Sequence, residues 1–316
     1  MKILFIDIVH PILMDRLQKF GFVCIDATKK NISEIYDDLD SAFGVVIRSR
    51  FTLNEEFLSR APKLKFIARS GAGLENIDIE YCKQNNILLF NSPEGNRNAV
   101  AEHALGMLLS LMNHLHFADQ QVRNGLWQRE INRGEELDGK TVGIIGYGNN
   151  GSAFAKKLSG FDVKVLAFDK YKSGFGDRFV QEATLDAIIQ NADVISLHIP
   201  YNKETHFLID KNFIGKLKKP IYLLNLSRGK IVKTEDLVSG LMMGQIKGAG
   251  LDVLEYESKS FEAFFEQELP EVFSYLIKNY NVILSPHVGG WSVESYYLLS
   301  SILADKILEV DWKSNL

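Results

Sequence analysis

Residues 140–151, KTVGIIGYGNNG, join an apolar run to a turn that contains three glycines. Gly146, Gly148 and Gly151 have the spacing G-x-G-x-x-G, and the next segment, SAFAKKL, has a helical composition. A strand that ends in such a turn and opens a helix begins a βαβ unit, which requires a parallel sheet. This stretch therefore predicts an α/β fold.

The same turn predicts a site for a nicotinamide dinucleotide. Its glycines let the backbone approach a pyrophosphate, and the helix N-terminus offers amide donors and a partial positive charge. The next apolar run ends at Asp169, 18 residues after Gly151, close to the roughly 20 expected for an acid that binds ribose hydroxyls. A carboxylate there would repel a 2′-phosphate, so the pattern favours NAD over NADP, although Lys170 and Lys172 weaken that preference.

Strand-like runs alternate with helical segments along the chain, in two groups. Nearly continuous apolar runs are typical of parallel strands that are buried on both faces. Each group therefore predicts one α/β domain with helices on both faces of a parallel sheet. The predicted strands are 2–7, 22–26, 44–49, 65–71 and 87–92 in the first group, and 140–146, 163–169, 193–199, 221–227, 247–253 and 281–287 in the second.

One long helix is predicted between the two groups of strands. Residues 98–125 place apolar side chains at helical spacing from Val100 to Leu115. Asn98 is the predicted N-cap and Gly125 the predicted stop. Because the apolar stripe is wide, we expect this helix to be packed on both sides, as a helix between two domains would be.

Composition excludes several classes of protein. The 316 residues fit two domains of roughly 150 residues each. A net charge of −4 without a long basic run argues against nucleic acid or an anionic membrane as the main partner. The two cysteines, Cys24 and Cys82, lie far apart, so neither a disulfide framework nor a metal cluster is expected.

The N-terminal run does not predict an export signal. Asp7 interrupts it early, and no cleavage site of small residues follows. No apolar segment approaches the roughly 20 residues that span a bilayer. We therefore expect a cytoplasmic protein.

Candidate catalytic and binding residues lie where predicted strands end. Ligands of open parallel sheets bind beyond the carboxyl ends of the strands, where Arg228, Asp252 and His287 are expected. A guanidinium binds a carboxylate through two parallel hydrogen bonds, so Arg228 predicts an anionic substrate. His287, in SPHVGG, is a candidate acid–base group. Either Glu255 or Glu257 would serve as its carboxylate partner, and the residues alone do not choose between them.

These motifs, in this order, resemble those of the D-isomer-specific 2-hydroxyacid dehydrogenases, and within that family the phosphoglycerate dehydrogenases. The resemblance covers nearly the whole chain and rests on LDGKTVGIIGYGNNG, NLSRGKIV, GLDVLEYE, ILSPHVGG and NSPEGNRNAVAEHALGMLL. It implies two domains of Rossmann or flavodoxin type, with a cleft that closes on the substrate by hinge motion. Residues 1–97 with 291–316 would form the substrate domain and residues 98–290 the NAD-binding domain. A homodimer is also expected.

The resemblance implies a role for each motif residue. Arg228 would bind the substrate's carboxylate and carbonyl, and His287 would be the acid–base group. Its partner would be Glu257, five residues after Asp252, rather than Glu255. The residues expected to line the cofactor are Gly146, Tyr147, Gly148, Asn149, Asn150, Gly151, Asp169, His198, Pro200, Thr205, Leu226, Ser227, Asp252, Gly289 and Gly290. Those expected at the substrate are Arg48 and the backbone amides of Ser70, Gly71, Ala72 and Gly73.

The implied reaction is hydride transfer between NAD and C2 of a D-2-hydroxy acid or a 2-oxo acid. Arg48, Arg50 and Arg69 favour a second anionic group, so 3-phosphoglycerate with 3-phosphohydroxypyruvate is the preferred pair. Hydroxypyruvate or glyoxylate reduction is the alternative within the family. Formate dehydrogenase shares the architecture, but there a glutamine accompanies the histidine. A non-catalytic NAD(H)-sensing module is a further alternative, although such a module need not keep the arginine, glutamate and histidine.

Three features depart from the family's pattern. Asn150 stands where an apolar residue is usual, so the packing of the following helix is expected to differ. The aromatic and acidic stretch 258–280 is longer than usual and would serve as core, dimer contact or lid. Since the printed sequence ends at residue 316, the C-terminal regulatory domain of some phosphoglycerate dehydrogenases is expected to be absent.

Overall fold

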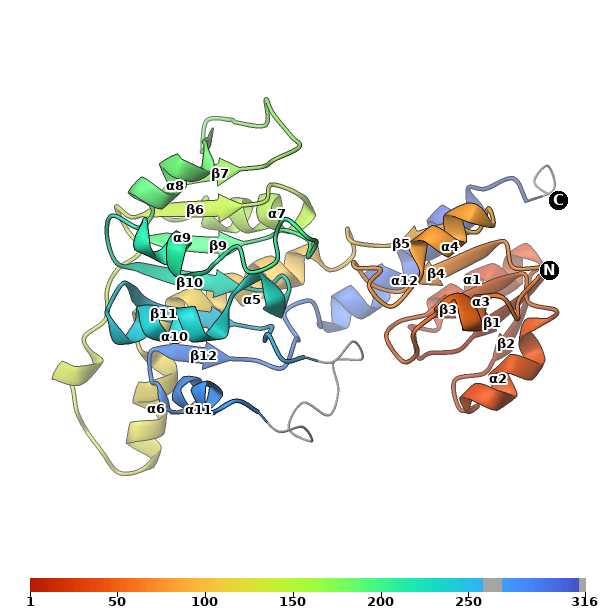
Figure 1. Ribbon diagram of the computed structural model, residues 1–316, viewed down its shortest axis with the longest axis horizontal. Coiled ribbons are helices and arrows are strands. Elements are labelled where there is room, and N and C mark those ends of the chain that lie inside the picture. The colour runs from red at the N-terminus through yellow and green to blue at the C-terminus, as the bar shows by residue number, and fades with distance from the viewer. Residues whose placement is uncertain (258–268, 313–316) are drawn as a thin grey trace. The chain divides into compact units, whose positions relative to one another are not determined.

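A computed structural model describes residues 1–257 and 269–312 of the chain. These residues form two compact units (Figure 1). The N-terminal unit contains Met1–Asn96 and the described residues from Trp291 onward. The central unit contains Arg97–Glu257 and the described residues up to Gly290. Each unit has its own parallel sheet with helices on both faces, which confirms the predicted α/β class.

The sheet of the N-terminal unit has five parallel strands in the order β2-β1-β3-β4-β5. Each strand predicted in this part of the chain is present, and each is shorter than expected. The strands are β1 (Lys2–Phe5), β2 (Val23–Asp26), β3 (Gly44–Ile47), β4 (Phe66–Arg69) and β5 (Leu88–Asn91).

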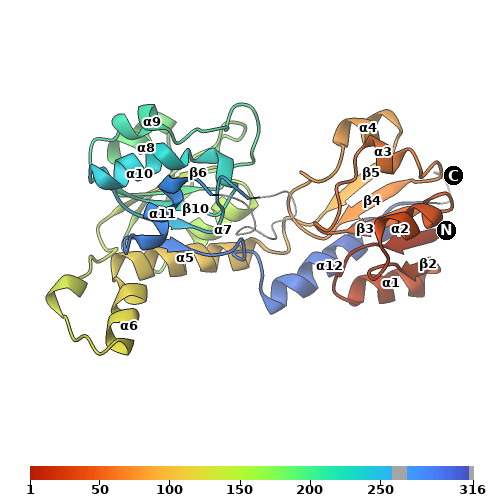
Figure 2. The ribbon, with the colours of Figure 1, turned by 60° about the horizontal axis from the view of Figure 1, so that its bottom comes forward.

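Helices cover both faces of this sheet. They are α1 (Ile12–Phe20), α2 (Ile32–Leu39), α3 (Glu55–Leu58), α4 (Ile79–Gln84) and α12 (Val293–Leu308). Successive strand residues point to opposite faces, so Leu4 packs with α2, α3 and α4 while Ile3 packs with α1 and α12. Figure 2 shows α1 and α12 side by side on their face of the sheet.

The central unit has a seven-stranded parallel sheet in the order β12-β11-β10-β9-β6-β7-β8. The order reverses at β6, with β7 on one side and β9 on the other, and ligands of such sheets bind at the carboxyl edge of this point. The three-residue edge strand β8 was not predicted. The strands are β6 (Thr141–Ile145), β7 (Lys164–Phe168), β8 (Val180–Glu182), β9 (Val194–Leu197), β10 (Ile221–Asn225), β11 (Ile246–Leu251) and β12 (Val282–Leu284).

Seven α-helices belong to the described part of the central unit. One core cluster joins α5 and α7 to one face of the sheet, and another joins α8, α9, α10 and α11 to the opposite face. Two 3₁₀ turns, Glu130–Asn132 and Gly229–Ile231, complete the unit. The helices are α5 (Arg97–Met112), α6 (Leu115–Arg123), α7 (Asn149–Leu158), α8 (Leu185–Asn191), α9 (Lys211–Gly215), α10 (Thr234–Met242) and α11 (Glu271–Lys278).

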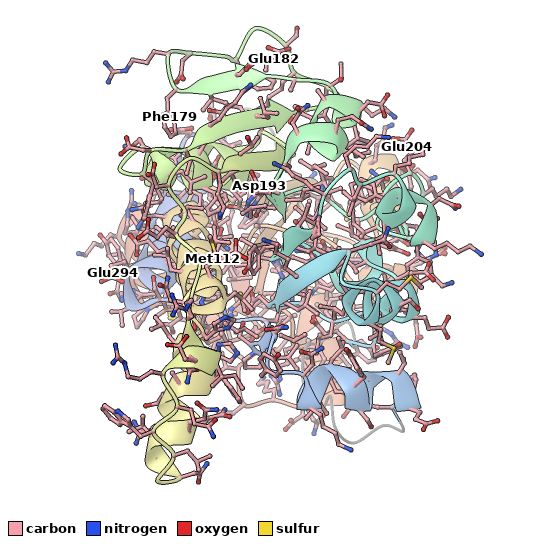
Figure 3. All side chains as sticks on the ribbon, turned by 90° about the vertical axis from the view of Figure 1, so that its left-hand side faces the viewer. Met112, Phe179, Glu182, Asp193, Glu204 and Glu294 are labelled. Atoms are coloured by element: carbon pink, nitrogen blue, oxygen red, sulfur yellow. The ribbon has the colours of Figure 1, made fainter. Side chains whose placement is uncertain are left out.

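The prediction of one helix over residues 98–125 is wrong. Helix α5 ends at Met112, which is labelled in Figure 3. Helix α6 begins at Leu115, directly after His114, whose φ of 53° is left-handed and breaks the helix. Leu115 is 57% exposed, so it does not extend the buried stripe of α5. Asn98 is the second residue of α5 rather than its N-cap. Within the central unit α5 contacts both α7 and the sheet. Its predicted place between two domains stays a prediction.

The stretch predicted as core, dimer contact or lid is described only in part, since residues 258–268 lie outside the described residues. In the described part, α11 buries Phe273 and Leu276 in the core of the central unit. The described part of this stretch therefore contributes to the core. Among the described residues, no helix is both long and apolar enough to cross a membrane.

Candidate active site

A histidine and a glutamate form a close polar pair at the carboxyl edge of the central sheet. His287 lies just after β12, and its Nδ1 is 2.7 Å from Oε2 of Glu257. The side chains are only 23% and 14% exposed, so solvent screens this pair less than a surface pair. With Nδ1–H donating to the carboxylate, Nε2 carries the lone pair of the neutral ring. This arrangement suits proton exchange at Nε2.

The glutamate is held in place by its own turn. Oε1 of Glu257 accepts a hydrogen bond from the N–H of Leu254. The other candidate acid, Glu255, instead accepts a hydrogen bond from the N–H of Thr234 at the start of α10, over 2.8 Å. Of the two acids, Glu257 is therefore the one that meets the histidine.

Asp252 anchors the segment that follows β12. It is 2% exposed, and its Oδ1 accepts hydrogen bonds from Ser285 Oγ and from the N–H of Val288, at 2.6 and 2.8 Å. Its Oδ2 accepts from the N–H of Gly289 over 2.8 Å. Hydrogen bonds to a carboxylate are about twice as strong as neutral ones, so Asp252 fixes this segment firmly.

Two members of this network were not predicted from the sequence. Nε2 of His103, on α5, lies 3.0 Å from Ser285 Oγ and 3.7 Å from Asp252 Oδ1. Ser285 lies in the same SPHVGG motif as the candidate acid–base histidine, which was the available signal. The only sequence signal at His103 was its polar side chain within an apolar helix. No local pattern connects it to a strand end far along the chain.

Arg228 follows β10 in an extended conformation, and its carbonyl accepts a hydrogen bond from Asn225 Nδ2 over 3.0 Å. The adjacent glycine is required for packing. A Cβ on Gly229 would lie 1.9 Å from the carbonyl oxygen of Leu254, a separation that no side chain can tolerate. Because Leu254 also donates to Glu257, the arginine segment and the glutamate segment are held together.

The dinucleotide turn contains glycines of two kinds. Gly146 has a φ of 95°, and a Cβ there would lie 2.4 Å from the carbonyl oxygen of His198. A Cβ on Gly151 would lie 2.0 Å from the carbonyl oxygen of Gly146. By contrast, no atom of the described residues lies within 4 Å of a Cβ on Gly148. Two glycines thus serve packing, while the third leaves open space at the N-terminus of α7, as the predicted approach of a pyrophosphate requires.

Asp169 follows β7 and joins the loop after this strand to the dinucleotide turn. Its Oδ2 accepts a hydrogen bond from the N–H of Tyr147 over 2.8 Å. Its Oδ1 accepts from the amides of Tyr171 and Lys172, at 2.9 and 3.0 Å. A carboxylate has roughly four lone-pair sites, so Asp169 retains capacity for about one hydroxyl.

The two lysines beside this carboxylate both have partners within the central unit. Lys170 forms an ion pair with Glu204, labelled in Figure 3. Lys172 Nζ donates to the carbonyl of Tyr147 over 3.3 Å. Glu204 therefore offsets the charge of Lys170, whereas Lys172 keeps its positive charge because its partner is a neutral carbonyl.

Two further predicted cofactor residues stabilise loops next to β9. The hydroxyl of Ser227 donates to the carbonyl of Leu197 over 2.6 Å, which ties the end of β10 to β9. The hydroxyl of Thr205 donates to the carbonyl of Pro200 over 2.8 Å and closes the loop between them. These contacts hold in place the backbone of the loops that are predicted to line the cofactor.

The glycine pair after the histidine sits against buried side chains. A Cβ on Gly289 would lie 2.8 Å from Asp252 Oδ2 and 3.2 Å from Leu226 Cδ2. Leu226 is itself buried, and Gly290 is the last residue of the central unit. This close approach explains why a glycine is needed at position 289.

Two predicted cofactor residues carry buried polar atoms that no described residue hydrogen-bonds: Oδ1 of Asn150 and Nδ1 of His198. Nε2 of His198 is paired with Ser196 Oγ at 2.9 Å. Burial lowers the pKa of the His198 imidazole to about 4, so this ring is neutral near pH 7. Helix α7 nevertheless packs normally beyond Asn150, since Phe154 and Leu158 are fully buried.

The remaining residues of the turn are Tyr147 and Asn149. The ring of Tyr147 stacks on Phe175, with centroids 4.4 Å apart. Asn149 is the first residue of α7, so its amide belongs to the open N-terminal turn of the helix.

The predicted substrate loop lies in the N-terminal unit, directly after β4. The amides of Ser70 and Gly71 donate to the carbonyls of Ile47 and Arg69, both over 2.8 Å. None of the described residues accepts a hydrogen bond from the amides of Ala72 and Gly73. Only the second half of the loop therefore offers amides to a ligand.

The three arginines predicted to meet the substrate differ in their surroundings. The guanidinium of Arg48 lies 3.8 Å from the ring centroid of Trp291. Arg69 Nε donates to the carbonyl of Arg48 over 3.2 Å. Arg50 is committed elsewhere, because its guanidinium donates to the backbone carbonyls of Ile6, Thr28 and Lys30.

Comparison with known proteins identifies relatives of both units. Residues 105–289 match the family described as "D-isomer specific 2-hydroxyacid dehydrogenase, NAD binding domain". The chain is 32% identical over 292 residues to a D-3-phosphoglycerate dehydrogenase of Bacillus subtilis, covering 90% of this chain but only 52% of that relative. It is 32% identical over 281 residues to a hydroxypyruvate reductase of Thermotoga maritima, covering 89% of this chain and 88% of the relative.

Solved structures show the same architecture. A D-lactate dehydrogenase from Aquifex aeolicus, complexed with NAD and lactic acid, has a TM-score of 0.83 and 28% identity over 98% of this chain and 94% of that one. The relatives thus carry three different substrate names at similar identity.

Proposed function

Because this chain belongs to the D-isomer specific 2-hydroxyacid dehydrogenase family and contains its NAD-binding domain, we propose that it interconverts a D-2-hydroxy acid and a 2-oxo acid. The observation that best supports this proposal is the 2.7 Å contact between His287 and Glu257. A bound nicotinamide would supply the hydride acceptor for oxidation at C2 of the substrate, or the hydride donor for reduction. The protein binds and orients the substrate and the cofactor, and it transfers the proton.

Nε2 of His287 is the atom proposed for proton exchange. In oxidation it takes the proton of the substrate hydroxyl, and in reduction it returns a proton to the carbonyl oxygen. The carboxylate of Glu257 stabilises the imidazolium form that carries this proton. Arg228 binds the carboxylate of the substrate through its planar fork and stabilises charge on the reacting oxygen.

We assign cofactor binding to the central unit, because the family match falls within it. The N-terminal unit would then be the substrate domain, with Arg48 and the amides of Ala72 and Gly73 as its ligands. Closure of a cleft by hinge motion stays a prediction of the family resemblance. A cytoplasmic location likewise stays a prediction.

NAD is proposed as the preferred cofactor over NADP. A 2′-phosphate at the adenosine ribose would meet the carboxylate of Asp169, and the neighbouring Lys170 is paired with Glu204. Equal catalytic efficiency with NADH and NADPH would contradict this assignment.

The preferred substrate pair is 3-phosphoglycerate and 3-phosphohydroxypyruvate. Support comes from Arg48 and Arg69, two cations next to the predicted substrate loop of the N-terminal unit. The engagement of Arg50 with backbone carbonyls weakens this support, since it removes one of the three expected cations. Hydroxypyruvate or glyoxylate reduction is therefore the alternative.

A panel of 2-oxo acids assayed with NADH tests the proposal. The panel contains 3-phosphohydroxypyruvate, hydroxypyruvate, glyoxylate and pyruvate, and kcat/KM is compared across it. Higher efficiency with short apolar oxo acids would refute the preference for a second anionic group. No turnover with any oxo acid, together with tight NADH binding, would favour a sensing module over an enzyme.

A homodimer is also proposed. Helix α6 and the residues after it expose several large apolar side chains, and Trp127 is 80% exposed. Exposed apolar groups of this kind mark protein contacts. We infer that a second copy of the chain covers them, which sedimentation measurements would test. A monomeric parent protein at micromolar concentration, or a dimer that persists in Trp127→Asp, would contradict this surface.

A further inference from the structure

Asn150 carries a polar atom that protein contacts alone leave unsatisfied. It is the second residue of α7, between Gly148 and Gly151 of the dinucleotide turn. Its Oδ1 is buried and has no hydrogen-bond partner among the described residues. Buried acceptors without a partner are rare and costly, so such an atom at a ligand site indicates a group supplied by the ligand.

The direction of the Asn150 side chain follows from the helix. Residues four apart lie on the same face of a helix, so Asn150 shares a face with Phe154. Phe154 is fully buried, and its ring centroid is 5.5 Å from that of His198, which follows β9. Asp169 follows β7, on the opposite side of β6. Asn150 therefore faces the β9 side of the turn, away from Asp169.

The residues proposed for substrate binding and proton exchange also lie on the β9 side of β6. Strands β9, β10, β11 and β12 lie on this side of β6, and the segments after them carry Arg228, Glu257 and His287. A dinucleotide whose adenosine ribose meets Asp169 must extend across β6 toward these residues. The ribose that carries the nicotinamide then lies on the side that Asn150 faces.

Because Oδ1 of Asn150 is a hydrogen-bond acceptor, its partner must be a donor. An amide oxygen accepts hydrogen bonds and cannot pair with the oxygens of a pyrophosphate, which are also acceptors. The nearest donors on a dinucleotide are the ribose hydroxyls that flank the pyrophosphate. We propose that Oδ1 of Asn150 accepts a hydrogen bond from a hydroxyl of the ribose that carries the nicotinamide. The proposal rests on the dinucleotide site described under the proposed function.

Replacement of Asn150 by an apolar residue should therefore have opposite effects on the stability of the free protein and on its affinity for NADH. In the free protein the unsatisfied oxygen destabilises the fold, and cofactor binding satisfies it. An apolar side chain of similar size removes the cost but cannot make the bond. Asn150→Leu should therefore keep or raise the unfolding temperature of the free protein and weaken NADH binding about 3- to 10-fold. A residue with a packing role alone would leave the affinity unchanged.

Calorimetric titration with NADH, ADP-ribose and ADP tests the assignment. The first two contain the second ribose and ADP does not, so the loss of affinity should appear with NADH and ADP-ribose and be absent with ADP. Asn191→Leu, at the exposed end of α8, is the matched control and should bind all three like the parent protein. If Asn150→Leu fails to fold, Asn150→Met provides the same comparison with a more adaptable side chain.

Two outcomes would overturn the proposal: parent-like affinity for NADH in the variant, or an equal loss with ADP. A parent protein that binds none of the three ligands would instead refute the dinucleotide site itself. The two failures are therefore distinguishable.

Discussion

Glu257 and His287 are 30 residues apart in the chain, yet their side chains meet at 2.7 Å because both segments are tied to neighbouring backbone. The N–H of His287 donates to the carbonyl of Asp252 over 2.8 Å, and the N–H of Leu254 donates to Glu257. The imidazole is thus oriented by the protein before any substrate arrives. Such pre-organisation reduces the reorganisation needed during the reaction.

Removal of the imidazole should abolish most turnover while cofactor binding survives. His287→Ala should lower kcat by about 10²- to 10⁴-fold, the usual contribution of a general acid–base group. NADH affinity, measured by fluorescence titration, should stay close to that of the parent protein, because the dinucleotide turn is untouched. Near-normal turnover would remove this residue from the mechanism. Glu257→Gln, which keeps the shape of the partner, should be less damaging.

Arg228→Lys should fail despite keeping the positive charge. An ammonium group cannot form the two parallel hydrogen bonds that a guanidinium makes with a carboxylate. We expect KM for the oxo acid to rise and kcat to fall, while NADH binds as before. Lys230→Arg, on an exposed neighbour, is the control and should leave the kinetics unchanged. Parent-like kinetics in Arg228→Lys would show that charge alone suffices.

Asp169 should determine the choice of cofactor through its charge. Asp169→Asn retains an acceptor for the amide of Tyr147 while removing the repulsion of a 2′-phosphate. The ratio of kcat/KM for NADH to that for NADPH should therefore fall. Asp169→Ala should also narrow the ratio but destabilise the protein, since three backbone amides lose their acceptor. An unchanged ratio in the Asn variant would place the selectivity elsewhere.

The glycines of the dinucleotide turn should respond differently to a methyl group. Gly148→Ala places its Cβ in open space, so thermal unfolding of the free protein should be nearly unchanged while NADH binding weakens. Gly151→Ala should lower the unfolding temperature, because its Cβ would lie 2.0 Å from a carbonyl oxygen. Calorimetry with and without NADH separates the two effects. Equal destabilisation by both variants would contradict the assignment of Gly148 to the ligand.

The buried imidazole of His198 should make folding sensitive to acid. Its pKa in the folded protein is about 4, below the roughly 6.5 of an unfolded histidine, so the unfolded state binds more protons between these values. The free energy of unfolding should therefore fall as the pH is lowered from 6.5 toward 4, by at most about 3 kcal/mol from this residue. His198→Gln cannot titrate and should show a flatter dependence in urea denaturation across this range. Identical slopes for the two proteins would exclude the residue as the source.

The strands were predictable because parallel strands buried on both faces appear as apolar runs, whatever lies elsewhere in the chain. Strand β8 escaped because only Val180 of its three residues is buried. The break between α5 and α6 also escaped, since neither Gly nor Pro marks it and His114 takes a left-handed conformation. Local patterns therefore identified elements but not where tertiary packing interrupts them.

The motifs predicted which residues lie at strand ends, but not how those residues are connected. Two glutamates in one loop, Glu255 and Glu257, have similar local sequence. The family resemblance favoured Glu257, and the contacts in the folded chain show that it is the one beside the histidine. The contact between His103 and Ser285 joins residues 182 positions apart, so it depends on how α5 packs against the sheet. Such relations become visible only in the folded chain.

The N-terminal unit completes its core with a late part of the chain. Leu303, Ile307 and Trp312 pack with Ile3 and Phe5, so one face of the first sheet is covered by α1 alone until residue 312 has been synthesised. At about 5–20 residues per second, the ribosome needs on the order of ten to forty seconds to pass from residue 97 to that point. The central unit can fold during this interval. Meanwhile the strands made first present an apolar surface, which is the kind of nascent chain that chaperones bind.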